Sequence, residues 1–150
     1  MLFIGKTKDQ NLNCLIGEYE RRLKKFCDLA LREIRDGERC DSAQRRMEQE
    51  GEALLARVRA DAYVLALDPA GESMSSEEFA SLIRQRRDRS LKDLVFVVGS
   101  HVGLSAQVKR RANKLLSLSA MTLNHEMARL FLVEQIYRAF TLIHRIPYHK

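Results

Sequence analysis

The sequence predicts an α/β fold with a largely parallel sheet, and two observations support this prediction. Short apolar runs bounded by glycine, proline or polar residues alternate along the chain with longer amphipathic segments at helical spacing. Such alternation is typical of parallel sheets, in which a helix returns the chain to the start of the next strand. The chain has 150 residues, of which 45% are hydrophobic and 31% charged, as in ordinary globular proteins. Because no repeat or linker interrupts the pattern, we expect a single domain over residues 1–150.

The first half of the chain contains two short strands and two helices. Residues 2–4 are apolar and precede Gly5, as at the end of a strand. Apolar residues recur at helical spacing over residues 12–23, and apolar and polar residues alternate over 29–34, which predicts a second strand. The helical pattern resumes at Ser42.

The next segment contains a strand, a turn and a capped helix. Residues 63–67 form a compact apolar run, and Asp68-Pro69-Ala70-Gly71 predicts a turn that ends it. Ser75, followed three residues later by Glu78, forms a capping box at the start of a helix. Residues 94–98 are the next strand.

The last third of the chain repeats this arrangement. Ser105 is a suitable N-cap for a helix that carries the basic residues between 109 and 114. The sequence "LLSLSAM", residues 115–121, predicts a short strand, and Asn124 begins a long helix that reaches about Ile143.

Charge and cysteine content restrict the possible functions. Lys and Arg number 26 and Asp and Glu 20, so the net charge is +6, which suggests a polyanionic partner, although many basic proteins bind nothing acidic. Cys14, Cys27 and Cys40 have neither disulfide nor metal-site spacing, and we expect idle thiols and no metal. No apolar run approaches membrane-spanning length and the N-terminus lacks secretory features, which predicts a cytoplasmic protein.

Ligands of open α/β sheets bind at the carboxyl ends of the strands. Three such ends are candidates: residues 67–68, 99–103 and 118–123. None has the spacing of a dinucleotide fingerprint or a P-loop, and each by itself is also compatible with an ordinary turn or core strand.

Three segments together resemble a known family. They are "LALDPAGESMSSEEFA" (residues 65–80), "FVVGSHVGLS" (96–105) and "LSLSAMTLNHEMARLFLVEQIYRAFTLIHRIPYHK" (116–150). They resemble the RlmH-type enzymes, which are large-subunit rRNA pseudouridine N3-methyltransferases of the SPOUT class, and the resemblance covers nearly the whole chain. It implies an α/β domain with a deep trefoil knot near the C-terminus, a homodimer, S-adenosylmethionine as cofactor and the 23S rRNA of the assembled ribosome as substrate.

The resemblance also implies the cofactor contacts. Carried over by motif, they are Leu67, Gly99, Gly103, Leu118, Ser119, Ala120, Met121, Thr122 and Leu123. Backbone N–H and C=O groups can recognise adenine, so such a loop needs shape and small or aliphatic side chains more than charge. The family usually has Gly-Gly-Pro-Glu-Gly where this chain has Gly-Ser-His-Val-Gly. An alternative hypothesis is therefore a catalytically weakened protein of the same fold that binds RNA or the ribosome.

The last helix and the tail carry the catalytic candidates. Glu134 and Arg138 are four residues apart and share a helical face, so we expect Arg138 to contact the RNA or the nucleophile and Glu134 to orient it; a surface ion pair is the alternative. The apolar band of this helix is too wide for one packed face, which favours one face on the sheet and another on a dimer partner. In the tail, Tyr148 can stack on a base and His149 can bind it or assist proton removal.

Four basic residues are candidates for contacts with RNA phosphates: Lys109, Arg110, Arg111 and Arg129. A solvated charged face is the alternative for these positions.

Overall fold

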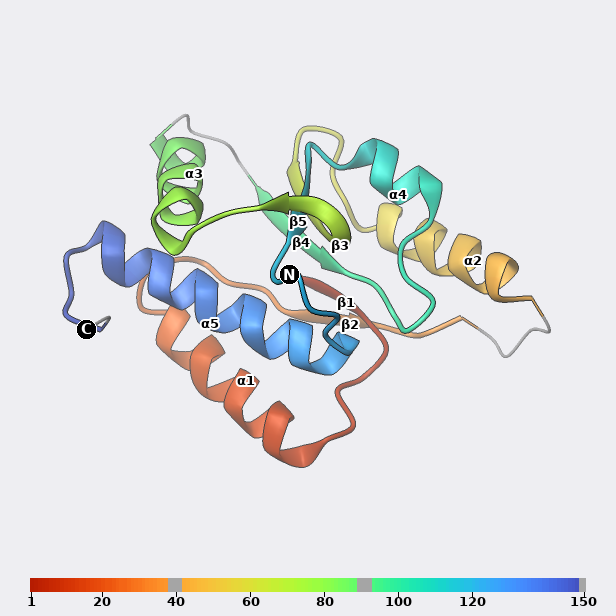
Figure 1. Cartoon of the computed structure of the whole chain (residues 1–150), viewed down its shortest axis with the longest axis horizontal. Helices are drawn as coiled ribbons and strands as arrows, with labels where there is room; N and C mark the ends of the chain where they lie inside the picture. Colours follow the sequence, from red (N-terminus) through yellow and green to blue (C-terminus); the bar gives the residue numbers. More distant parts are fainter. Residues whose placement is uncertain (38–41, 89–92, 149–150) are drawn as a thin grey trace.

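The computed structural model describes residues 1–37, 42–88 and 93–148. Within these residues, five strands form one all-parallel sheet in the order β2-β1-β4-β3-β5 (Figure 1), which confirms the predicted α/β class. The strands are β1 Leu2–Ile4, β2 Arg32–Ile34, β3 Tyr63–Ser73, β4 Leu94–Val98 and β5 Lys114–Ser117. The helices are α1 Gln10–Leu23, α2 Ala43–Leu55, α3 Ser76–Asp88, α4 Ala106–Arg111 and α5 His125–Ile143.

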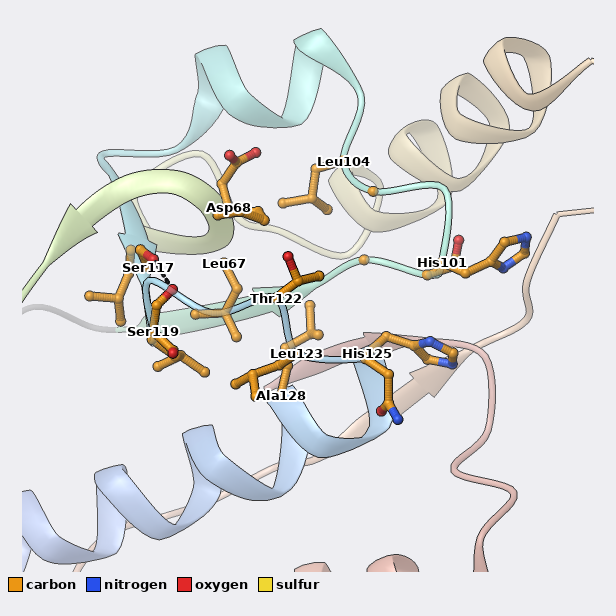
Figure 2. A pocket seen from close by; sticks show the side chains of 18 of the residues that line it. Leu67, Asp68, His101, Leu104, Ser117, Ser119, Thr122, Leu123, His125 and Ala128 are labelled. Atoms are coloured by element: carbon orange, nitrogen blue, oxygen red, sulfur yellow. Dashed lines mark hydrogen bonds between the residues drawn. The ribbon is translucent and has the colours of Figure 1, made fainter.

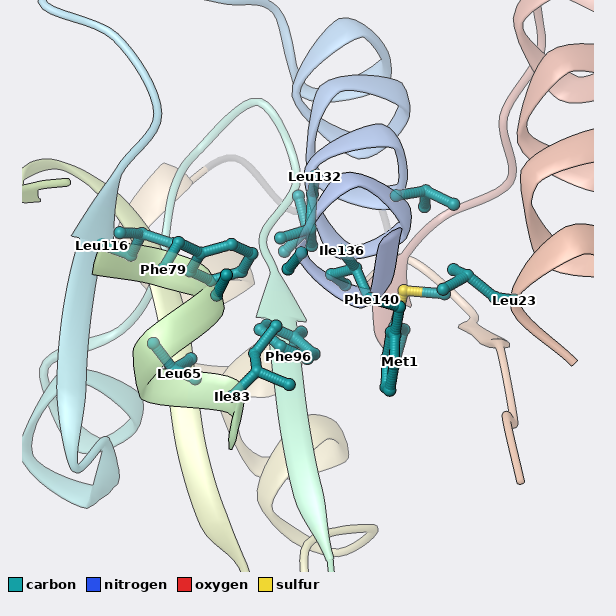
Figure 3. Close-up of a cluster of buried hydrophobic side chains, with 14 of the residues drawn as sticks. Met1, Leu23, Leu65, Phe79, Ile83, Phe96, Leu116, Leu132, Ile136 and Phe140 are labelled. Atoms are coloured by element: carbon teal, nitrogen blue, oxygen red, sulfur yellow. The ribbon is translucent and has the colours of Figure 1, made fainter. Parts of the chain in front are cut away.

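Helices cover both faces of the sheet, and each face has its own apolar core. Successive side chains of a strand point to opposite faces, so Leu65 of β3 enters one core while Val64 and Ala66 enter the other. The first core lies under α1, α3 and α5, where Phe96 of β4 packs with Phe79 of α3 (Figure 3). The second core lies under α2 and α4. This burial on both faces explains why β1, β4 and the first part of β3 are continuous apolar runs.

β2 is shorter than the sequence indicated. It pairs with β1 over three residues, from Leu2 opposite Arg32 to Ile4 opposite Ile34. Leu29 and Leu31 lie outside the strand and pack against the first core while partly exposed. The length of β1 therefore limits the length of its neighbour.

The turn expected at residues 68–71 is an interruption within β3, and the strand continues beyond it. Leu67 and Glu72 both align with Leu116 of β5, so the intervening residues bulge out of the ladder. Gly71 is required there, because a Cβ atom would lie 2.7 Å from the backbone of Leu115.

The end of α4 and the start of β5 also differ from the expectation. Lys114 is the first residue of β5, and α4 ends at Arg111. Asn113 causes the change in direction, because its backbone N–H donates to Val64 O at 2.9 Å and its side-chain oxygen accepts from Val64 N at 2.8 Å. β5 ends at Ser117, so residues 118–123 form a loop.

The predicted helix starts are confirmed. Ser75 and Glu78 form the reciprocal bonds of a capping box, at 2.8 and 3.1 Å. The side chains of Ser105 and Asn124 accept from the first turns of α4 and α5. α5 ends at Ile143, as expected.

The wide apolar band of α5 is mostly buried within the chain. α5 lies on the sheet and is flanked by α1 and α3, so these helices account for most of its second apolar face (Figure 1). Two large apolar side chains of α5, Met127 and Phe131, remain exposed, as does Leu15 of α1.

Candidate functional site

A pocket of about 390 Å³ opens at the carboxyl ends of β4 and β5 and at the interruption of β3, beside the start of α5 (Figure 2). Eight of the nine residues assigned to the cofactor by resemblance line this pocket: Leu67, Gly99, Gly103, Leu118, Ser119, Met121, Thr122 and Leu123. Ala120 belongs to the same loop but is not among the lining residues. The three strand ends therefore form one concave site, because parallel strands present their carboxyl ends at one edge of the sheet.

The loop after β4 depends on its two glycines. A Cβ atom at position 99 would lie 2.7 Å from the carbonyl oxygen of Gly103. Gly103 has φ +85°, which is strained for any residue with a side chain, and its N–H donates to Ser100 O at 3.1 Å. The loop is thus folded tightly on itself where it borders the pocket.

Glu50 of α2 anchors the same loop, and the sequence patterns did not single it out. Its carboxylate is 2% exposed and accepts from Ser100 Oγ at 2.6 Å and from Arg46 Nε at 3.0 Å. Ser100 Oγ in turn accepts from the N–H of Val102 at 3.3 Å. The signal for Glu50 was its position four residues before Leu54, on the buried side of the helix.

The loop after β5 is held by bonds from its own serines. Ser117 Oγ donates to Ser119 O at 3.0 Å, and Ser119 Oγ accepts from the N–H of Met121 at 2.9 Å. Met121 is 79% exposed at the rim of the pocket.

A carboxylate borders the pocket on the side of β3. Asp68 is nearly buried and pairs with Lys109 of α4 at 2.6 Å, and it accepts from the N–H of Ala70 at 2.9 Å. Burial by itself would raise the pKa of Asp68, but these hydrogen bonds outweigh burial and lower the pKa below its usual value. Asp68 therefore stays ionised at the pocket rim, and its pair with Lys109 balances the charge.

Two further residues predicted to contact RNA, Arg129 and Arg111, instead form hydrogen bonds within the chain. Arg129 is fully buried, where its guanidinium donates to Thr7 Oγ1 at 3.0 Å and to the carbonyl of Ile4, so it has no surface for a phosphate contact. Arg111 donates to three backbone carbonyls before β3, those of residues 59, 60 and 62. Arg110 is exposed on α4. The expectation for Arg129 is thus wrong, because α5 presents this residue to β1 and not to solvent.

The expected pairing of Glu134 with Arg138 is present. Arg138 donates to Glu134 Oε1 from Nε at 3.1 Å and from Nη2 at 2.8 Å. The Tyr148 hydroxyl donates to the same oxygen at 3.2 Å and lies 3.0 Å from the hydroxyl of Tyr19. Burial, the hydrogen bond with Tyr19 and the charge of Glu134 raise the pKa of Tyr148, so it remains a neutral donor. His149 lies outside the described residues.

This cluster and the pocket lie at different parts of α5. His125 and Ala128 line the pocket in the first turn, whereas Arg138 is ten residues beyond Ala128. At 1.5 Å per residue this separation is about 15 Å along the helix axis. A single chain therefore does not bring the predicted catalytic cluster to its own pocket.

Comparison with known proteins identifies the class of enzyme to which this parallel α/β chain belongs. A family model described as "Predicted SPOUT methyltransferase" matches residues 1–149, and the chain belongs to the SPOUT methyltransferase family. It is similar to the ribosomal RNA large subunit methyltransferase H of Clostridium botulinum (strain Hall), with 41% identity over 155 residues that cover 100% of this chain and 98% of the relative. The enzyme of that name from Trichlorobacter lovleyi is 40% identical over 149 residues, which cover 99% of this chain and 97% of the relative.

SPOUT methyltransferases use S-adenosylmethionine, and the pocket has features that fit this cofactor. Its volume lies within the range of small-molecule sites, and apolar side chains predominate in its lining. Asp68 offers a carboxylate for hydroxyl groups such as those of a ribose. Among the described residues, no helix could span a membrane, and no group of three His, Cys, Asp or Glu side chains could hold a metal.

Proposed function

We propose that this chain methylates N3 of a pseudouridine in the 23S rRNA of the large ribosomal subunit. The observation that carries the proposal is the pocket, in which eight residues assigned by family resemblance line one cavity. Full-length similarity to ribosomal RNA large subunit methyltransferases supports the same reaction and substrate.

S-adenosylmethionine, when bound, supplies an activated methyl group. The residues of this chain then have two tasks, to hold donor and acceptor in line and to favour the deprotonated base. Leu67 and residues 118–123 would enclose the adenosine part by shape and backbone hydrogen bonds, and Asp68 would accept from hydroxyl groups.

We propose Arg138 as the group that stabilises the developing anion at N3, because a nearby cation lowers the cost of losing the proton. Glu134 fixes the guanidinium through two hydrogen bonds, and Tyr148 is a neutral hydrogen-bond donor beside it. His149 would add a hydrogen-bonding or proton-accepting group. Arg110, which is exposed, remains a proposed phosphate contact, together with Lys109 when its pair with Asp68 opens.

The active unit is a homodimer of single-domain chains with the trefoil knot of the SPOUT class. The separation of about 15 Å along α5 supports this, because a second copy can bring its own cluster to the pocket of the first. The exposed apolar residues Leu15, Met127 and Phe131 on α1 and α5 offer surface for such a contact.

The test combines cofactor binding with methyl transfer. Purified protein should bind S-adenosylmethionine in calorimetry, and it should transfer labelled methyl groups to large subunits from a strain that lacks its own enzyme. Binding to ribosomes without measurable cofactor binding or methyl transfer would contradict the proposal. That result would favour the alternative of a catalytically weakened ribosome-binding protein.

A further inference from the structure

A second cavity adjoins the cofactor pocket. It has a volume of about 690 Å³ and lies at the carboxyl ends of β1 and β2, where Lys6, Lys8 and Arg35 contribute to its lining. Ser100, His101 and His125 line both cavities. Figure 2 shows the imidazole groups of His101 and His125 at the same end of the cofactor pocket. The two cavities are therefore contiguous, with these shared residues at the boundary.

The loop that carries Lys6 and Lys8 is fixed by its backbone. The N–H of Gly5 donates to Ile34 O at 2.7 Å, and that of Thr7 donates to Glu33 Oε1 at 3.0 Å. The N–H groups of Lys8 and Asp9 both donate to the carboxylate of Glu126 in the first turn of α5, at 3.1 Å each.

Buried Arg129 completes the support of this loop. It donates to the carbonyl of Ile4 on one side and to the hydroxyl of Thr7 on the other. The backbone that carries the lysines is thus held before any ligand arrives, so binding has to order only their side chains.

The side chains of the cavity leave an excess of positive charge. Arg46 is engaged by Asp36 and Glu50, and Glu33 accepts from Thr7. Lys6, Lys8 and Arg35 are exposed, and their side chains make no hydrogen bond or ion pair with the rest of the described chain. Because Lys6, Lys8, Arg35 and Arg46 outnumber the lining carboxylates Glu33 and Asp36 by two, the cavity favours an anionic ligand.

We propose that this cavity, named here the lysine cleft, binds backbone phosphates of the RNA strand beside the target nucleotide. The strand would follow Lys6, Lys8 and Arg35, and the target base would pass the boundary at Ser100 and His101 toward the cofactor. This inference rests on the proposed function. It assigns RNA positioning to a surface different from α4, and these phosphate contacts set the register of the strand without reading its sequence.

The test removes two charges and keeps a polar side chain at both positions. The double variant Lys6→Gln/Lys8→Gln is compared with Lys25→Gln, which removes an exposed charge beyond the far end of α1. Binding to large subunits that lack the methyl group is measured across a salt series. Because two phosphate contacts are lost, the slope of log affinity against log salt concentration should become less negative by about 1.5. The KM for these subunits should rise at least tenfold, whereas Lys6→Arg/Lys8→Arg should retain most of the affinity.

Three further measurements distinguish an RNA contact at the lysine cleft from a loss of fold or a contact with protein. Cofactor affinity and melting temperature should stay near the wild-type values in the double variant, because both lysines are exposed. Hydroxyl-radical footprinting should show that wild type protects the rRNA backbone next to the target and that the double variant loses this protection. If affinity falls with an unchanged RNA footprint, the contact is with an acidic ribosomal protein and the inference is wrong.

The inference is also overturned if the double variant matches Lys25→Gln in salt slope and KM. That result would leave the proposed function intact as long as wild type methylates the subunits. If wild type binds the subunits with the predicted salt dependence but transfers no methyl group, the proposed function fails while the lysine cleft stands.

Discussion

Single residues set the shape of the cofactor pocket, and Gly99 shows this most directly. Its missing side chain allows the loop after β4 to fold against its own carbonyl group at Gly103. Neighbouring Ser100 adds a bond to the buried carboxylate of Glu50, which anchors a loop whose sequence departs from the usual family pattern. The changed loop therefore has its own means of keeping a defined conformation.

Gly99→Ala should weaken cofactor binding at least tenfold, a loss of about 1.4 kcal/mol. The added Cβ would meet the carbonyl oxygen of Gly103 at 2.7 Å, so the loop must move. Calorimetric titration with S-adenosylmethionine measures the change. Gly17→Ala is the matched control: its Cβ would meet nothing within 4 Å on α1, and it should leave affinity unchanged while stabilising the helix by about 0.5–1 kcal/mol. Equal affinities for both variants would contradict this account of the loop.

Arg138→Ala should reduce methyl transfer to large subunits by at least a hundredfold and change cofactor affinity less than twofold. Its guanidinium is held by Glu134 and lies away from the pocket of its own chain. Single-turnover methylation and calorimetry measure the two properties separately. Parallel loss of both would indicate that the pair with Glu134 is structural.

At the scale of elements, the connection between α5 and β1 depends on Arg129. This residue links α5 to the carbonyl of Ile4 and to Thr7 from a position without solvent exposure. Burial lowers the pKa of Arg129, and the charges of Glu126, Glu33 and Asp36 partly oppose this effect. These hydrogen bonds hold β1, the loop of the lysine cleft and α5 together.

Arg129→Ala should lower the free energy of unfolding by about 3 kcal/mol, because it leaves a cavity and buried acceptors without donors. Arg110→Ala, on the exposed side of α4, should change it by less than about 0.5 kcal/mol. Urea denaturation at pH 7 measures the free energy of unfolding of both variants. A cost for Arg129→Ala as small as that of Arg110→Ala would mean that the buried guanidinium does not stabilise the fold.

The pair between β3 and α4 predicts a pH dependence. The pKa of Asp68 is lowered in the folded chain, so its ionised form adds stability above its unfolded pKa, and this stability is lost as pH falls through the folded pKa. The variant Lys109→Met removes the shortest hydrogen bond to Asp68. As pH falls below about 4, the free energy of unfolding should therefore decrease less steeply in this variant than in wild type. Denaturation curves between pH 3 and 7 test this, and identical acid limbs for variant and wild type would contradict it.

The described residues are built around one sheet, which helices cover on both faces. Phosphate contacts from a basic surface position RNA without reading its sequence. We therefore infer that specificity arises from the shape of a preformed target against which two copies dock.

Assembled large subunits should accordingly be methylated much faster than naked transcripts of the same RNA. The comparison uses labelled cofactor with intact ribosomes, isolated large subunits and protein-free 23S transcripts. We expect at least a hundredfold lower kcat/KM on the transcript. Equal efficiency on the transcript would contradict this inference and indicate that the protein reads the RNA sequence.

Local features of this protein were predictable from its amino-acid sequence. Strand and helix alternation, the caps at Ser75, Ser105 and Asn124, and the strand ends that border the pocket all follow from patterns within a few residues. Parallel connectivity then brings the strand ends to one edge, so most of the pocket was predictable before its geometry was known.

Contacts between distant parts of the chain determine which charged side chains are available for function. Arg129 is buried against a residue 122 positions away, Lys109 pairs with Asp68, and Arg111 binds the backbone before β3. The sequence patterns also did not show that the carboxylate of Glu50 is buried. Nor did they show that Arg138 lies away from the pocket along α5. Basic residues follow no local pattern that distinguishes a phosphate ligand from a structural donor. Long-range packing makes that distinction, because it determines which acceptors lie within reach of each side chain.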